Sequence, residues 1–489
     1  MDLSQLPDIS DQLVTPANPA RDPADGMDVA RCVALHNYLV HYAWVAEGRS
    51  PDTLRRNSST YFAAHGAAAE ALRPRLHPSL AAFLDAAIVP LHDDPISGGW
   101  FFWVSEFSYP QYLFDEHLAD LKDMPADSVV NLYEGGMYIE TGGGLFYHQG
   151  SHHTVFFMHM DEYDYAFPIE AYQELWHPLE TVLSNWINLI LIGKVVPSLP
   201  VEPSLFGSEK FGCWEWRPYS DAQVDICIAA WDRLCETIEA RILRRTAGNA
   251  VNNDDCNNKC HNSEPPLVPP AVLDAASVPD PGFARAFLTR ARRPLFHRIA
   301  PGLVLPAMDK EGFALQQPYT SLHRSSPYSI PPICLFPADG ERLVYLTGRT
   351  CTFTEDFSPL YNSNIPPRVN AGVYGESVER NNYDNAEEGF RLLLPFGFKK
   401  RYGESTEPGV RTSDGSFAES MGSLFQHGFK PFGGDVIRPQ RLECLFNCWR
   451  KLIDDGIWSV GPEGVEGTLD TFREADGELW RHYCIPLSW

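Results

Sequence analysis

Hydrophobic residues recur every three or four positions in several parts of the chain, which is the spacing of an amphipathic helix. This pattern predicts helices over residues 27–47, 60–72, 78–91, 168–176, 178–192, 221–245, 439–455 and 468–482. The segment 178–192 is apolar nearly all round, so we expect that helix to be buried.

Two segments rich in aromatic and β-branched residues, 137–148 and 153–161, predict the strands of a β-hairpin. Gly150-Ser151 between them predicts a two-residue turn. In this register His148 faces His153, and the pairing continues outward from there.

The same register brings one histidine and two carboxylates together. Glu140 lies opposite Asp161, His159 shares their face of the strands, and Gly142 opposite His159 has no side chain to block access. Two opposed carboxylates repel each other unless both are in water, share a proton or hold a cation between them. The three alternatives are a solvated hairpin end, an acid/base pair and a metal site.

The segment 100–114 contains eight aromatic residues. Such a segment forms either a packing seam in the core or the wall of a pocket for an apolar ligand. In the second case we expect the pocket to be lined by Trp100, Phe102, Trp103, Phe146 and Phe157.

The metal alternative rests on the spacing of His159 and Asp161, which is that of a site with two histidines and one carboxylate. Its ligands would be His159, Asp161, Glu140 and His177. His153 lies six strand residues from His159, roughly 20 Å away, and cannot share an ion with it in an unbroken strand.

Composition changes along the chain predict its domains. Residues 1–25 form a loose arm, 26–245 a helical and β-hairpin domain with the candidate site, and 246–282 a linker rich in Asn and Pro. Residues 283–489 form a C-terminal domain in which short apolar segments predict strands near 333–336, 342–346, 350–353 and 391–394. The predicted class is α+β, with an N-terminal helical region around a β-hairpin core and a C-terminal domain of mixed short strands and helices.

A net charge of −25 over 489 residues argues against nucleic acid and anionic membranes as partners, because both need a basic surface. The N-terminus has no secretory pattern, and the longest apolar segment, 186–196, is too short to span a bilayer. Eleven scattered cysteines indicate reduced thiols, so we expect a cytoplasmic protein. None of the common phosphate-loop, dinucleotide, zinc-protease or serine-hydrolase motifs occurs.

The segments 176–194 and 214–245 together resemble large proteins of filamentous fungi to which no activity is attached. The resemblance implies no catalytic residue. It favours small-molecule metabolism only modestly.

The sequence therefore predicts a cofactor-independent enzyme that acts on a small, largely apolar metabolite by isomerisation, cyclisation, elimination or hydrolysis. Glu140 or Asp161 would exchange the proton with His159 as partner. Two alternatives stay open: an enzyme with a divalent metal ion at the His/Asp/Glu site, and a non-catalytic binding or scaffold protein with an aromatic surface.

Overall fold

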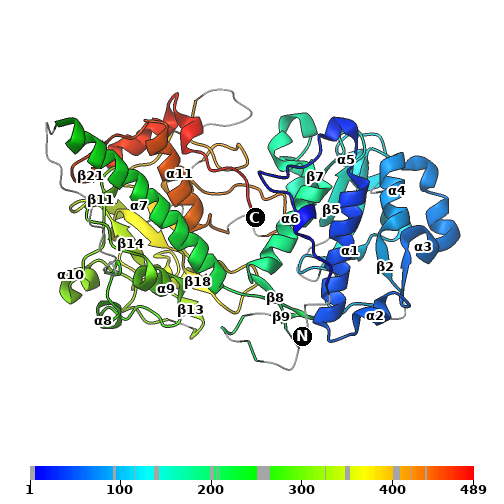
Figure 1. The fold of residues 1–489 in the computed structure, drawn as a ribbon, viewed down its shortest axis with the longest axis horizontal. Coiled ribbons are helices and arrows are strands. Elements are labelled where there is room, and N and C mark those ends of the chain that lie inside the picture. Colours follow the sequence, from blue (N-terminus) through cyan, green and yellow to red (C-terminus); the bar gives the residue numbers. More distant parts are fainter. Residues whose placement is uncertain are drawn as a thin grey trace. The chain divides into compact units, whose positions relative to one another are not determined.

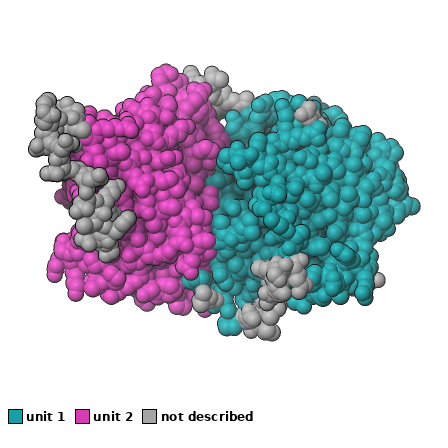
Figure 2. Space-filling model, viewed as in Figure 1, with its two compact units in different colours: residues 1–217, 429–436, 487–489 teal, residues 218–428, 437–486 magenta. Residues whose placement is uncertain are grey.

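The computed structural model describes residues 6–91, 95–114, 116–136, 142–198, 203–204, 206–208, 210–249, 265–324, 326–346, 353–399, 408–418, 420–434 and 438–489. They fall into two compact units, drawn in teal and magenta in Figure 2. Unit 1 comprises Met1–Arg217, Phe429–Val436 and Leu487–Trp489, and unit 2 comprises Pro218–Gly428 and Ile437–Pro486. Both contain helices and small sheets, which confirms the α+β class. The division between the units falls after Arg217, whereas composition placed a boundary at 246–282.

The described part of unit 1 is built around a five-stranded antiparallel sheet (Figure 1). Its strands follow chain order: β3 (Val104–Phe107), β4 (Val129–Gly135), β5 (Gly144–His148), β6 (His153–Phe157) and β7 (His177–Pro178).

The hairpin of β5 and β6 has the predicted register, with His148 opposite His153 and Gly144 opposite Phe157. The predicted two-residue turn is wrong, because four residues, 149–152, connect the strands. The backbone N–H of His152 donates to the carbonyl of His148 at 2.9 Å, and His152 closes the loop at a φ of 58°.

One face of this sheet is covered by helix α6 (Leu179–Leu191), which packs against β6 and against helix α1 (Val29–Ala46). Trp186 of α6 is 1% exposed, stacks on Phe101 and meets the edge of Phe156. The predicted burial of this helix is confirmed, because its apolar side chains meet the sheet on one side and α1 on the other.

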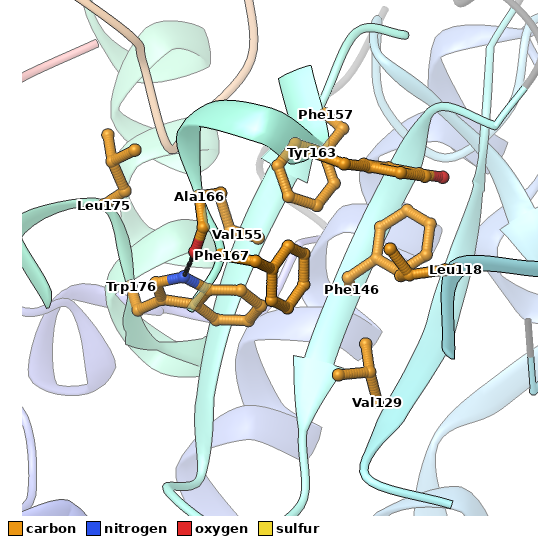
Figure 3. Close-up of a cluster of buried hydrophobic side chains, with 10 residues drawn as sticks. All are labelled: Leu118, Val129, Phe146, Val155, Phe157, Tyr163, Ala166, Phe167, Leu175 and Trp176. Carbon is orange, nitrogen blue, oxygen red and sulfur yellow. Dashed lines mark hydrogen bonds between the residues drawn. The ribbon is translucent and has the colours of Figure 1, made fainter. Parts of the chain in front are cut away.

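The opposite face carries the aromatic cluster of Figure 3. Phe146 and Phe157, from β5 and β6, pack on Tyr163, and the indole N–H of Trp176 donates to the carbonyl of Ala166 at 3.0 Å. Both faces of the sheet are therefore covered, one by α6 and the other by the segment after β6.

The remaining elements of unit 1 are short. The helices are α2 (Pro51–Leu54), α3 (Tyr61–Glu70), α4 (Pro78–Ala86) and α5 (Glu116–Leu121). One small sheet pairs β1 (Ser58–Thr60) with β2 (Ile88–Pro90), and another pairs β10 (Trp214–Trp216) with β8 (Val195–Pro197) and β9 (Lys210–Phe211).

The helix predicted over 78–91 ends at Ala86, because the β-branched Ile88 and Val89 pair with β1. The helix predicted over 168–176 is also wrong: it consists of two 3₁₀ helices, Ile169–Ala171 and Gln173–Leu175, separated by Tyr172 at non-helical backbone angles.

In unit 2 the long helices α7 (Asp221–Asn249) and α11 (Leu442–Asp454) pack against each other. Shorter helices are α8 (Pro270–Ala275), α9 (Phe283–Arg290) and α10 (Lys310–Leu315). The larger sheets contain β12 (Leu303–Val304), β11 (Arg298–Ala300), β21 (Gly464–Val465) and β20 (Val460–Gly461), and β14 (Cys334–Pro337), β17 (Gly372–Gly375) and β19 (Phe390–Leu393). Unit 2 also contains two pairs of strands: β13 (Ser329–Ile330) with β18 (Val378–Glu379), and β15 (Leu343–Tyr345) with β16 (Arg368–Asn370).

The helix predicted over 468–482 is instead formed by two 3₁₀ helices, Leu469–Asp476 and Trp480–Tyr483.

Two parts of the predicted linker, residues 246–249 and 265–282, lie within the described chain, and the first belongs to α7. In the second part the prolines alternate with apolar residues, and Leu267, Val268 and Leu273 are fully buried. This part therefore belongs to the packed interior of unit 2. Among the described helices, none is both long and apolar enough to cross a membrane.

Candidate functional site

A cavity of about 700 Å³ lies in unit 1 where β4 ends. It is bordered by short, exposed connections on one side and by the sheet on the other. Its lining residues are Leu72, Arg75, Pro110, Gln111, Tyr112, Phe114, Glu116, Asn131, Glu134, Gly135, Gly142 and Gly143. Half of these residues carry polar side chains, so the cavity combines a mainly polar lining with the aromatic rings of Tyr112 and Phe114.

A β-bulge in β4 places two polar side chains on the cavity side of the sheet. Asn131 pairs with Phe146 of β5, whereas Glu134 pairs with Gly144, so β4 contains one more residue than β5 between these two pairs. In a regular strand, residues three apart point to opposite faces. The extra residue, Leu132, reverses the alternation, and Asn131 and Glu134 share the face of Phe146.

Glu134 is the carboxyl group in this wall with a shifted pKa. Burial raises the pKa of Glu134, and the nearby carboxylate of Glu106 raises it further. The backbone N–H of Tyr109 donates to Oε1 of Glu134 at 3.3 Å and partly opposes that shift. A carboxyl group that gains and loses its proton closer to neutral pH is suited to proton transfer.

Two further residues shape the cavity. The Arg75 guanidinium lies 4.0 Å from the centre of the Phe114 ring, and its Nε donates to Asp127 at 2.7 Å. Oδ1 of Asn131 is buried without a hydrogen-bond partner among the described residues. A buried acceptor of this kind is costly. The oxygen is closed off from solvent, so a molecule in the cavity does not reach it.

The raised pKa of Glu134 leads to a prediction about stability. The folded state favours the neutral carboxyl, so the favourable contribution of Glu134 is complete below its unfolded pKa of about 4.3 and is lost as the pH rises through the folded pKa. Glu134→Gln cannot ionise and should gain stability relative to the wild type between pH 4 and pH 8. Urea unfolding at the two pH values measures this change, with Glu174→Gln on the exposed surface as control. A stability difference between Glu134→Gln and wild type that does not change with pH would contradict it.

The predicted catalytic residues are only partly described. Glu140 lies outside the described residues. His159 precedes a 3₁₀ helix (Met160–Tyr165) and accepts a hydrogen bond from the backbone N–H of Asp161 at 3.2 Å. Its Nδ1 lies 3.6 Å from the Asp161 carboxylate, and the two side chains are 37% and 86% exposed. The structure thus brings His159 and Asp161 together, in a helix-capping arrangement that faces water.

The cavity reaches the predicted site at Gly142. A Cβ added there would lie 2.9 Å from Cβ of Met160, the residue between His159 and Asp161, and 3.0 Å from the hydroxyl of Tyr163. That hydroxyl donates to the carbonyl of Gly142. The residue in front of Gly142 is therefore Tyr163 and not His159, because β6 ends at Phe157 and the chain turns into the 3₁₀ helix.

Gly142→Ala should destabilise the protein by about 1–3 kcal/mol, because Gly142 has a φ of 84° that an L-residue rarely adopts. Gly340→Ala is a matched control: its φ is 83°, but nothing lies within 4 Å of an added Cβ. We expect Gly142→Ala to cost more than Gly340→Ala in urea unfolding. Equal costs would show that Met160 and Tyr163 move away freely.

The structure places the five predicted pocket residues in the packed interior. Trp100, Phe102, Trp103, Phe146 and Phe157 are all nearly or fully buried, and none is among the residues that line the cavity. Phe102 and Trp103 contact each other edge to face at 4.9 Å. This is the packing-seam alternative for the aromatic segment.

His177 lies far from the other members of the alternative metal site. It pairs with Thr154 in the sheet, and Thr154 lies five residues before His159, or roughly 16 Å along an extended strand. Its Nε2 lies 3.0 Å from the carbonyl oxygen of Glu174, and burial lowers the pKa of His177 to about 4. His177 and His159 therefore cannot bind one ion. Within the described ranges, no three side chains of His, Cys, Asp or Glu are placed to hold a metal ion together.

Comparison of the chain with protein-family profiles, with curated proteins and with solved structures gave no match in any of the three.

Proposed function

We propose that this protein is a cofactor-independent enzyme that acts on a small metabolite by acid/base catalysis in the cavity at the end of β4. The observation that carries the proposal is Glu134, a partly buried carboxyl group with a raised pKa in the wall of a 700 Å³ cavity. Perturbed carboxyl groups inside cavities are concentrated at catalytic sites, because proton transfer requires a pKa near the working pH.

The lining supports a substrate with an apolar part and polar groups. Tyr112 and Phe114 offer aromatic surface, and Arg75, Gln111 and Glu116 offer polar side chains beside Glu134. Glu134 would then exchange a proton with the bound molecule, as in an isomerisation, an elimination, a cyclisation or a hydrolysis.

A mixture of candidate substrates tests the activity. The protein is incubated with a metabolite extract in D₂O, and each compound is followed by mass spectrometry. We expect at least one compound to change mass by incorporated deuterium or by water gained or lost, or to convert into an isomer with a different retention time. Compounds that bind but do not change would show a binding protein and contradict the catalytic proposal.

The sequence-based hypothesis for Glu140, His159 and Asp161 stays a prediction. His159 and Asp161 flank Met160, which lies at the Gly142 side of the cavity. Asp161→Asn in the same assay tests it: loss of turnover would place Asp161 in the reaction, and unchanged turnover would leave the chemistry with Glu134.

A further inference from the structure

Unit 2 contains a second hollow, a groove of about 450 Å³ between helices α7 and α11. Four arginines line it, Arg233, Arg241 and Arg244 from α7 and Arg450 from α11, together with the acidic residues Glu236 and Asp454. The groove has an excess of positive charge in a chain whose net charge is −25.

The packing of the two helices positions these arginines. Trp231 of α7 contacts Phe446 of α11 with ring centres 5.4 Å apart, which fixes the helices side by side. Arg233, Arg241 and Arg244 are spaced eight and three residues apart, which is close to two turns and one turn of a helix. They therefore share one side of α7. They extend along roughly 16 Å of the helix at the usual rise per residue.

The arginines of the groove are poorly neutralised. Arg233 contacts the side-chain oxygen of Asn447 at 3.4 Å, and Arg241 donates to the backbone carbonyl of Asp454 at 3.2 Å. The Arg244 side chain makes no hydrogen bond or ion pair with any described residue. Arg450 approaches the Asp454 carboxylate at 4.0 Å, while its Nε is buried without a partner among the described atoms.

Two arginines at and just after the end of α9 differ. Arg290 forms an ion pair with Asp225, and Arg292 reaches Glu239 of α7 at 2.9 Å. Neighbouring guanidinium groups repel one another, and this repulsion is relieved when an anion binds between them.

We propose that the groove between α7 and α11 binds a small polyanion that carries two or more phosphate or carboxylate groups. Guanidinium groups bind both kinds of group through paired N–H donors, and Arg233, Arg244 and Arg450 can each contribute such a fork. Their distribution along the groove suits a ligand with separated anionic groups. The site is independent of the cavity in unit 1.

Isothermal titration of the full-length protein at physiological salt tests the proposal with two probes, tripolyphosphate and citrate. The double variant Arg233→Gln/Arg244→Gln should weaken binding by about tenfold or more, because each charge-assisted contact contributes on that scale. Both side chains are exposed and neither forms an ion pair with the described chain, so thermal melting should be unchanged.

The double variant Arg290→Gln/Arg473→Gln is the matched control, since it removes two charges of unit 2 that do not line the groove. It should bind as the wild type does. Binding of tripolyphosphate alone or of citrate alone would support the proposal and identify the recognised group. Absence of binding by both probes, or equal weakening in the two double variants, would overturn it.

Discussion

Trp186→Ala should lower the free energy of unfolding by about 3–5 kcal/mol, the range for truncating a buried aromatic side chain. The side chain of Trp186 lies between the sheet and the backbone of α6, and it is stacked on Phe101 with ring centres 5.2 Å apart. Its indole N–H also donates to the carbonyl of Phe432 at 2.7 Å. The substitution leaves a cavity among these rings and a buried carbonyl without its donor.

Leu191→Ala in the same helix is the control, because the Leu191 side chain is 54% exposed. It should change stability by no more than about 0.5 kcal/mol. Urea unfolding of both variants measures the difference. Similar values for Trp186→Ala and Leu191→Ala would mean that α6 is not the covering helix of the sheet.

Glu134→Gln should lower turnover by a factor of about 10²–10⁴ on the substrate found in the extract, because a positioned proton-transfer group contributes on that scale. The amide keeps the size of the side chain and can still accept from the Tyr109 N–H. Substrate binding should therefore change much less than the rate, a difference seen by measuring kcat and KM separately.

Glu106→Gln provides a second readout of the same residue. Removing the Glu106 charge should lower the pKa of Glu134, because burial and the Glu106 carboxylate are the two causes that raise it. The corresponding limb of the pH–rate profile should move to lower pH, while the maximal rate stays near that of the wild type. An unmoved limb would show that another group titrates in the reaction.

Long periodic segments made most of the fold predictable. The helices predicted over 27–47, 178–192, 221–245 and 439–455 all exist, because each buries a continuous apolar face that outweighs local details. The segments 168–176 and 468–482 became 3₁₀ helices, a distinction that depends on tertiary contacts rather than on periodicity. The hairpin register followed from centring the connection on Gly150-Ser151, although the connection has four residues and not the predicted two.

The candidate site was harder to predict from sequence. Strand alternation was extended past Phe157 to His159 and Asp161, but the chain leaves the strand there and winds into a 3₁₀ helix. Glu134 was missed because only the bulge at Leu132 brings it to the same face as Asn131, and a bulge leaves no periodic signal. The available signal was an acid inside an apolar strand directly before Gly135-Gly136.

The most direct test of the central claim compares the wild type, Glu134→Gln and Glu174→Gln in the metabolite extract in D₂O. Glu174 is an exposed glutamate outside the cavity, so its variant controls for loss of one carboxylate. The account predicts that the wild type and Glu174→Gln change the same compounds at the same rates, and that Glu134→Gln leaves those compounds almost unchanged. Equal conversion by Glu134→Gln would contradict it.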